Sequence, residues 1–215
     1  MTDTPAHPDT STATVDGPEQ WDQRYADADQ VWSGAPNGAL LTEVASLSPG
    51  RVLDVGCGEG ADAVWLAGHG WDVTALDVSR VALDRATAHA RRAGVEVTWL
   101  HSGLVDAELP AGGFDLVSAQ YPALARTPTA DAERALLAAV APGGTLLVVH
   151  HEVDAEYARA HGFDPTAYVL PPDVRALLDD RWEIEVDELR ARDIPEGGAG
   201  VHHTHDVVLR ARRLR

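Results

Sequence analysis

Hydrophobic and polar positions along the chain switch repeatedly between the two-residue period of strands and the 3.6-residue period of helices. Residues 51–55 read Arg-Val-Leu-Asp-Val after a Ser-Pro-Gly turn, which predicts a short buried strand. Residues 81–92 are rich in alanine and are followed by Gly94, which is typical of a helix and its C-terminal cap. The expected strands are 51–55, 72–76, 95–100, 114–119, 145–150, 182–189 and 205–211, and the expected helices are 61–68, 81–92, 130–140 and 171–180.

The order of these elements indicates an α/β fold. Strands that alternate with helices predict parallel pairing, because each crossover between parallel strands needs the length of a helix. The last two strands are joined by a Gly-rich loop at 195–200, which predicts an antiparallel hairpin. We therefore expect a Rossmann-like, doubly wound seven-stranded sheet, mostly parallel with an antiparallel seventh strand. The Thr- and Pro-rich residues 1–18 are expected to be a disordered tail, 152–170 an irregular or helical insertion, and 19–215 one domain.

Composition and charge restrict the partners. The formal net charge is −17, and so acidic a surface repels phosphate backbones and anionic lipids, so we expect no nucleic-acid and no membrane partner. No apolar run reaches the roughly 18 residues of a membrane span. The single cysteine, Cys57, excludes an internal disulfide and a multi-cysteine metal site, which favours a cytoplasmic location. All 17 basic residues are arginine, which excludes a lysine Schiff base and a P-loop.

The strongest chemical signal is the stretch Val-Leu-Asp-Val-Gly-Cys-Gly-Glu-Gly at 52–60. Gly56 and Gly58 permit a sharp turn from strand to helix and let a ligand approach the main chain. The helix that begins near Gly60 offers N–H groups and a positive dipole end to a carboxylate. Asp54, at the end of the strand, can bind an ammonium group or order water around it. The stretch therefore suits a zwitterionic ligand.

Asp77 adds a second signal, because it ends the next expected strand where carboxylates bind ribose hydroxyls in nucleotide-binding sheets. Together with Asp77, the stretch 52–60 resembles the first motifs of class I S-adenosylmethionine-dependent methyltransferases. The resemblance extends over 21–213. Trp-Asp-x-Arg-Tyr at 21–25 and Val-Trp-Ser-Gly-x-Pro-Asn at 31–37 are similar to small-molecule methyltransferases of the thiopurine and tellurite-resistance type.

The resemblance implies that the N-terminal segment covers the cofactor. Trp32 would pack on S-adenosylmethionine and Arg24 or Tyr25 would contact its methionine end, ordinary core packing being the alternative for the tryptophans. Many members hold the adenine amino group with Asp-Leu after the third strand. This chain has Gly-Leu there, so Ser102 or the backbone N–H of Leu104 would make the contact. The expected cofactor-binding residues are Trp21, Arg24, Trp32, Asp54, Gly56, Gly58, Gly60, Asp77, Ser102, Gly103, Leu104 and Gln120.

An alternative interpretation is a nicotinamide-dependent oxidoreductase, because Gly56-x-Gly58-x-x-Ala61 also matches the dinucleotide fingerprint. Two features disfavour it: Asp54 stands where dinucleotide motifs carry an apolar residue, and the final hairpin is typical of methyltransferases. A non-catalytic cofactor- or metal-binding module is a third interpretation. We expect methyl transfer from S-adenosylmethionine to a small molecule, without predicting the acceptor atom or the oligomeric state.

The fourth expected strand ends in Ala-Gln-Tyr-Pro at 119–122. This segment lacks the Asn-Pro-Pro-Tyr type of motif that positions an amino group in nucleic-acid and glutamine methylation. Gln120 and Tyr121 are expected beside the methyl donor, and a turn with a packed tyrosine is the alternative.

Histidines gather in the last third of the domain. In the family's topology the seventh strand lies between the fifth and sixth, so we expect His203 and His205 to approach His150 or His151 at the ligand-binding edge. Three interpretations stay open: structural histidines, a group that orients or deprotonates the substrate, or a divalent transition metal site. The histidines of this segment are His150, His151, His161, His202, His203 and His205. The candidate catalytic residues are His150, His151, His203 and Tyr121, and the candidate metal ligands are His151, His203 and His205 with Glu152 or Asp206.

Overall fold

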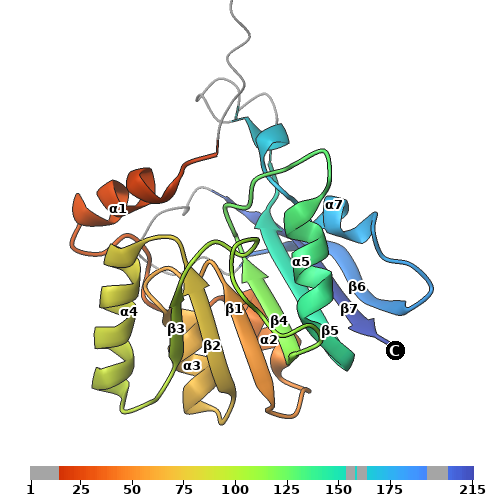
Figure 1. Ribbon diagram of the computed structural model, residues 1–215, viewed down its shortest axis with the longest axis horizontal. Helices are drawn as coiled ribbons and strands as arrows, with labels where there is room; N and C mark the ends of the chain where they lie inside the picture. The colour runs from red at the N-terminus through yellow and green to blue at the C-terminus, as the bar shows by residue number, and fades with distance from the viewer. Residues whose placement is uncertain (1–14, 154–157, 159–163, 193–202) are drawn as a thin grey trace, which may run out of the picture.

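The computed structural model describes residues 15–153, 158, 164–192 and 203–215 (Figure 1). Its strands are β1 (Arg51–Val55), β2 (Asp72–Asp77), β3 (Thr98–His101), β4 (Phe114–Gln120), β5 (Val140–His151), β6 (Trp182–Ala191) and β7 (His205–Arg213). They form one sheet in the order β3-β2-β1-β4-β5-β7-β6. The first five strands pair in parallel, and β7 is antiparallel to both β5 and β6. The predicted sheet and its antiparallel seventh strand are therefore confirmed.

Helices cover both faces of the sheet. They are α1 (Pro18–Ala26), α2 (Gly38–Val44), α3 (Ala61–Gly68), α4 (Arg80–Ala93), α5 (Asp131–Ala139), the 3₁₀ turn η1 (Pro165–Ala167) and α7 (Pro171–Arg175). Within the described part of the chain, none of the helices has the length and apolar character needed to cross a membrane.

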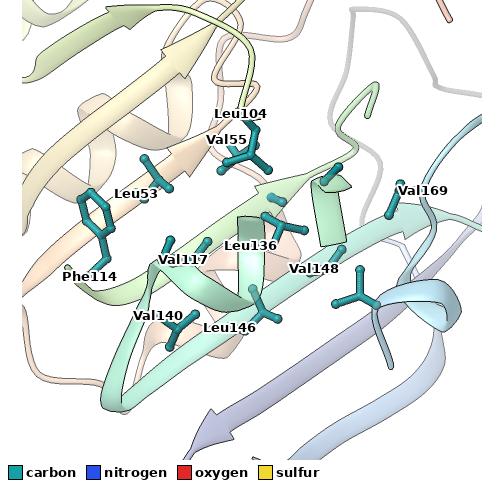
Figure 2. Close-up of a cluster of buried hydrophobic side chains, with 14 of the residues drawn as sticks. Leu53, Val55, Leu104, Phe114, Val117, Leu136, Val140, Leu146, Val148 and Val169 are labelled. Atoms are coloured by element: carbon teal, nitrogen blue, oxygen red, sulfur yellow. The ribbon is translucent and has the colours of Figure 1, made fainter. Parts of the chain in front are cut away.

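Alternation along the central strands gives the sheet two apolar faces, because successive side chains point to opposite sides. On one face Leu53 and Val117 pack with Leu136 of α5, in the cluster that Figure 2 shows. On the other face Leu116 packs with Leu40 of α2, in the cluster that also includes residues of α3. All five side chains are fully buried. Burial on this scale contributes about 1.5–3 kcal/mol for each large aliphatic side chain and fixes the register of the strands.

Two predicted boundaries differ from the structure for local reasons. The third strand begins at Thr98 rather than at residue 95, because the N–H of Val95 donates to the carbonyl of Ala90 at 3.1 Å. This bond closes the C-terminus of α4 around Gly94, which has φ +71°. The helix predicted over 171–180 ends at Arg175, after which the chain continues in turns.

Two other boundaries move because of neighbouring elements. Helix α5 ends at Ala139, and β5 begins at Val140 instead of residue 145, with an irregular start in its pairing to β4. Helix α1 begins at Pro18, inside the expected tail, and Asp22 in α1 accepts a hydrogen bond of 2.6 Å from Ser79 at the start of α4. Residues 1–14 of the expected tail, and the loop at 195–200, lie outside the described residues.

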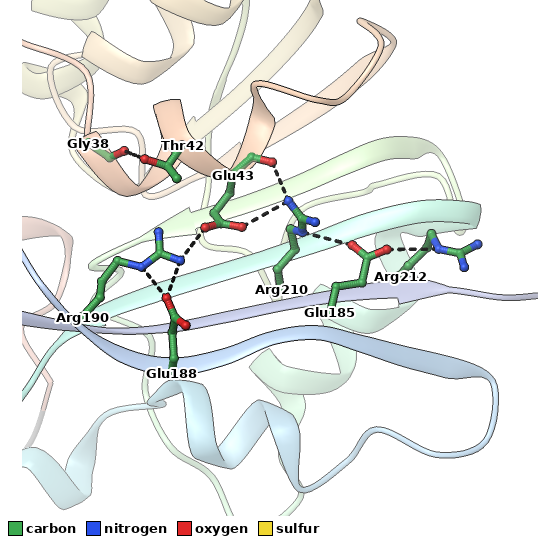
Figure 3. Close-up of polar contacts among 8 residues, drawn as sticks. All are labelled: Gly38, Thr42, Glu43, Glu185, Glu188, Arg190, Arg210 and Arg212. Atoms are coloured by element: carbon green, nitrogen blue, oxygen red, sulfur yellow. Dashed lines mark hydrogen bonds and ion pairs between the residues drawn. The ribbon is translucent and has the colours of Figure 1, made fainter.

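Helix α2 is fixed to the last two strands by ion pairs (Figure 3). Glu43 is 3% exposed, and its carboxylate lies 2.7 Å from Arg190 of β6 and 3.1 Å from Arg210 of β7. Arg210 also pairs with Glu185 at 3.0 Å, which extends the network along the sheet. One edge of the sheet holds the carboxyl ends of the parallel strands β1, β2, β4 and β5. The start of β7 lies at the same edge, because β7 is antiparallel to β5.

Candidate functional site

A cavity of about 1070 Å³ opens at this edge of the sheet. Its wall joins the loop after β1, the segment that contains α1, and the ends of β4 and β5 with the start of β7. Ligand pockets commonly measure about 300–1,000 Å³, so this cavity lies at the large end of the range for ligand sites. The lining includes Trp21, Arg24, Trp32, Asp54, Gly56, Gly58, Asp77, Gly103, Leu104, Gln120, Tyr121, His150, His151, His203, His205 and Asp206.

The glycines of the loop after β1 are required by its backbone. Gly58 has φ +52°, and a Cβ placed on it would lie 2.9 Å from the hydroxyl of Tyr25 and 3.2 Å from Nε1 of Trp32. Gly60 has φ +80°, and its Cβ would lie 2.8 Å from the Cβ of Ala86 in α4. Gly60 is not among the residues that line the cavity, and it lies where α3 packs closely on α4.

The N-terminal segment lies against this loop. The hydroxyl of Tyr25 accepts a hydrogen bond of 2.8 Å from Nε1 of Trp32. Glu59 in the glycine loop accepts the backbone N–H of Trp32 at 3.0 Å and pairs with Arg85 at 2.9 Å. Arg85 in turn donates to the carbonyl of Tyr25 at 2.7 Å. Four polar contacts therefore hold Trp32 against the glycine loop, and sequence reasoning did not identify Glu59 and Arg85.

Arg24 lies beside the aromatic side chains of this segment. Its guanidinium carbon is 5.1 Å from the ring of Trp21 and 5.6 Å from the ring of Trp32. These distances are in the range of cation–π contacts. Arg24 thus reaches the cavity wall as a positive charge next to the glycine loop.

Two buried carboxylates end neighbouring strands at the floor of the cavity. Asp77 is 8% exposed, and its oxygens accept the N–H groups of Gly58 and Ser79, both at 2.8 Å. Asp54 is 2% exposed, and its Oδ2 has no hydrogen-bond partner among the described residues. Burial raises the pKa of Asp54 well above its usual range, and the nearby carboxylates of Asp62 and Asp77 raise it further.

Gln120 and the segment after β3 complete this part of the cavity wall. The Nε2 of Gln120 donates to Ser118 at 3.0 Å, while its Oε1 is buried and lacks a partner in the described part of the chain. Gly103 and Leu104 line the cavity. Ser102 is not among the lining residues, and its hydroxyl donates to the carbonyl of Gly103 at 3.0 Å.

The histidine end of the cavity is built around Asp206 at the start of β7. Asp206 is 3% exposed; its Oδ2 accepts the hydroxyl of Tyr121 at 2.8 Å, and its Oδ1 lies 3.3 Å from Nδ1 of His151. The ring of His151 stacks on Tyr121 at 4.2 Å and on His203 at 4.1 Å between centroids. Arg192 lies 5.2 Å from the ring of Tyr121. The predicted approach of His203 to His151 is therefore confirmed.

The other predicted histidines have different surroundings. His150 is buried, its Nδ1 lies 3.2 Å from the carbonyl oxygen of His151, and burial lowers the pKa of His150 to about 4. His205 lies 3.0 Å from the hydroxyl of Thr204 and 3.9 Å from Glu152, and no contact of its ring with His150 or His151 is found among the described residues. His161 and His202 lie outside the described residues.

The structure does not support the predicted metal site. Among the described residues, no group of three His, Cys, Asp or Glu side chains has the arrangement of a metal site. His151 and His203 stack with an angle of 9° between their rings, whereas metal ligands direct ring nitrogens at a common point. His205 is turned toward Glu152 instead of joining them.

Comparison with known proteins agrees with this geometry. A family described as a methyltransferase domain matches residues 52–144. An uncharacterized methyltransferase of Mycobacterium tuberculosis (strain ATCC 25618 / H37Rv) is 40% identical over 122 residues, which cover 56% of this chain. The match spans 61% of the length of that relative.

Two solved structures resemble the whole chain. One was determined in work on the conversion of a disulfide bond into a thioacetal group during echinomycin biosynthesis; it aligns with a TM-score of 0.72 and 26% identity over 91% of this chain and 92% of its own. The other, the N-methyltransferase NodS from Bradyrhizobium japonicum in complex with S-adenosyl-L-homocysteine, aligns with a TM-score of 0.63 and 20% identity over 93% and 90%. Over residues 52–144 the chain thus matches a methyltransferase domain, and its overall fold is shared with the N-methyltransferase NodS.

Proposed function

We propose that this protein transfers the methyl group of S-adenosylmethionine to a small-molecule acceptor. The observation that carries the proposal is the buried carboxylate of Asp54, which lines the cavity and keeps one oxygen without a partner among the described residues. Burial and two neighbouring carboxylates oppose its charge, so a cationic ligand would relieve a cost that the free protein bears. The methionine end of S-adenosylmethionine carries an ammonium and a sulfonium.

The residues of the cavity wall fit the remaining parts of this cofactor. Asp77 ends β2 at the position for ribose hydroxyls, and each of its oxygens retains a lone pair beyond its bond to the backbone. Arg24 supplies a positive charge for the carboxylate, and the buried Oε1 of Gln120 accepts a hydrogen bond. The backbone at Leu104 offers a contact for the adenine. Bound S-adenosylmethionine supplies an activated methyl group, so these residues mainly align the reactants and exclude water.

A small-molecule acceptor fits the remainder of the cavity, between Gln120 and the histidine end. The net charge of −17 disfavours nucleic acid, and the related protein studied in echinomycin biosynthesis acts in the chemistry of a small molecule. A dinucleotide would place its anionic pyrophosphate against the glycine loop beside the carboxylate of Asp54, which disfavours the oxidoreductase alternative. The single cysteine agrees with a cytoplasmic enzyme.

Calorimetry tests the proposal directly. We expect S-adenosylhomocysteine to bind and NAD to give no heat of binding. Asp54→Ala should weaken S-adenosylhomocysteine binding at least about tenfold, while Asp72→Ala, at the exposed start of β2, should leave the affinity unchanged. Tight binding of NAD without a response to S-adenosylhomocysteine, or full affinity in the Asp54→Ala protein, would refute the proposal.

A further inference from the structure

The ring of His151 is enclosed on both faces at the acceptor end of the cavity. Tyr121 stacks on it with an angle of 26° between rings, and His203 stacks with an angle of 9°. Two rings at centroid distances of 4.2 and 4.1 Å cannot occupy the same face, so they lie on opposite faces. His151 lines the cavity, and only the edge of its imidazole can interact with a ligand there.

Asp206 determines which edge that is. Its Oδ1 lies 3.3 Å from Nδ1 of His151, and its Oδ2 accepts the hydroxyl of Tyr121 at 2.8 Å. A carboxylate accepts hydrogen bonds, so the proton of a neutral His151 is held on Nδ1 and the lone pair is on Nε2. Arg192 also lies near Asp206, with its Nε 3.9 Å from Oδ2 of the carboxylate.

We infer that Nε2 of His151 is the general base for the methyl acceptor, that Asp206 is its positioning residue, and that the acceptor is a hydroxyl or thiol compound. The inference rests on the proposed function. A neutral amine attacks with its own lone pair and releases a proton to water afterwards. A hydroxyl is a weak nucleophile until its proton is removed, and a thiol reacts as the thiolate, so these acceptors need a base held in place.

The step balances without any further reactant. The acceptor O–H or S–H gives its proton to Nε2 of His151, and the acceptor atom forms a bond to the methyl carbon. The bond between that carbon and the sulfonium sulfur breaks, and its electron pair stays on sulfur. The products are the methyl ether or thioether and S-adenosylhomocysteine. The proton on Nε2 then leaves to water, and the imidazole returns to its neutral form.

Neither His150 nor Tyr121 fits this role as well. His150 is buried and its Nδ1 is within hydrogen-bond distance of a backbone carbonyl, so its side chain is placed as a structural group. The hydroxyl of Tyr121 donates to Asp206, and burial together with that carboxylate raises the pKa of Tyr121 above its usual range. Tyr121 therefore keeps its proton, and its ring packs against the imidazole of His151.

The tautomer of His151 can be measured without knowing the acceptor. Long-range ¹H–¹⁵N spectra of the labelled protein with S-adenosylhomocysteine, assigned with His151→Gln, should show a protonated Nδ1 and an unprotonated Nε2. Asp206→Asn should redistribute the proton, whereas Glu152→Gln, a carboxylate that lies near His205, should not change the His151 signals. A proton on Nε2 in the native protein would overturn the inference. Because S-adenosylhomocysteine affinity is measured separately, failure of cofactor binding is distinguishable from failure of the base assignment.

A pair of probe acceptors tests the base itself. Thiophenol is largely ionised near neutral pH and phenol is not, although the two have nearly the same shape. His151→Gln should lower kcat with phenol by about 10²-fold or more, and with thiophenol by less than about fivefold. KM for both should change little, since the ring edge is replaced by an amide. Equal losses of kcat on the two acceptors would assign His151 a structural role and overturn the inference.

Discussion

Glu43 in α2 and Arg210 in β7 are joined twice, although they are far apart in the sequence. Arg210 Nη1 donates to the backbone carbonyl of Glu43 at 2.9 Å and lies 3.1 Å from its Oε2. Arg190 of β6 approaches the same carboxylate at 2.7 Å (Figure 3). One buried carboxylate therefore connects a helix that follows the N-terminal segment to the two strands at the end of the sheet.

Replacement of Glu43 by Gln should lower the free energy of unfolding by about 1–3 kcal/mol, because two partly buried arginines lose their shared counter-charge. Glu183→Gln is the matched control, since that glutamate pairs with Arg212 while its side chain is 52% exposed; its loss should stay below about 0.5 kcal/mol. Urea denaturation measures both. Each variant removes one negative charge from a chain whose net charge is −17, so any gain from reduced overall repulsion is common to both. A loss of stability for Glu43→Gln that is equal to or smaller than the loss for Glu183→Gln would contradict the role assigned to the buried pair.

Gly58→Ala should weaken the affinity for S-adenosylhomocysteine at least about tenfold, because the new methyl group displaces Tyr25 and Trp32 from the glycine loop. Gly94→Ala provides the control: Gly94 has φ +71°, but a Cβ there meets no atom within 4 Å. Both variants should lose about 1–2 kcal/mol of stability from the left-handed backbone. Only Gly58→Ala should lose affinity in calorimetry, and equal affinities would show that the aromatic contacts do not shape the cofactor site.

The contact between Asp22 and Ser79 should give a pH-dependent contribution to stability. The hydrogen bond from Ser79, the largest cause, lowers the pKa of Asp22 below its usual value of 3.8 in the folded protein. The contribution is therefore complete above the unfolded-state pKa and is lost as pH falls through the lower folded-state pKa. Asp22→Asn should destabilise the protein at neutral pH and converge with the native protein in acid, with the exposed Asp72→Asn as the control for a lost charge. A difference that is constant with pH would disprove this linkage.

The parts of the fold that the sequence predicted are those set by local patterns. The buried strand at Arg51–Val55 and the cap at Gly94 follow from residues within a few positions of each other. Helix α1 was not predicted, because among its side chains only that of Tyr25 is buried. It is held instead by contacts with distant residues, such as the bond between Asp22 and Ser79, which no local pattern encodes.

In the candidate site, too, some features follow from the order of the strands and others depend on contacts between distant residues. Strand order alone predicted that His203 approaches His151, because β7 pairs antiparallel with β5. The expected approach of His205 to His150 or His151 is not seen among the described residues, because the ring of His205 lies beside Thr204 and Glu152. Asp206 was considered only as a metal ligand. Its bond to Tyr121, 85 residues earlier, depends on a side-chain orientation that a two-residue period does not specify.

Asp54→Asn should separate stability from cofactor binding. In the folded protein the carboxylate is buried, has one oxygen without a partner among the described residues, and faces repulsion from Asp62 and Asp77. Asparagine keeps the shape without the charge. The cofactor-free variant should therefore be more stable than the native protein at neutral pH by an amount on the order of 1 kcal/mol. The same change should weaken S-adenosylhomocysteine binding, because the ligand's ammonium loses its counter-charge.

The pH dependence identifies the cause of that gain. Because the folded-state pKa of Asp54 is raised above its unfolded value, the native carboxyl takes up a proton as pH falls through the folded-state pKa and becomes neutral like asparagine. The stability difference should therefore be present at neutral pH and shrink toward zero in acid. Urea titrations of both cofactor-free proteins across this range measure it. A native protein that is more stable than Asp54→Asn at neutral pH would mean that the carboxylate is compensated within the free protein, and a difference that persists in acid would assign the gain to packing instead of charge.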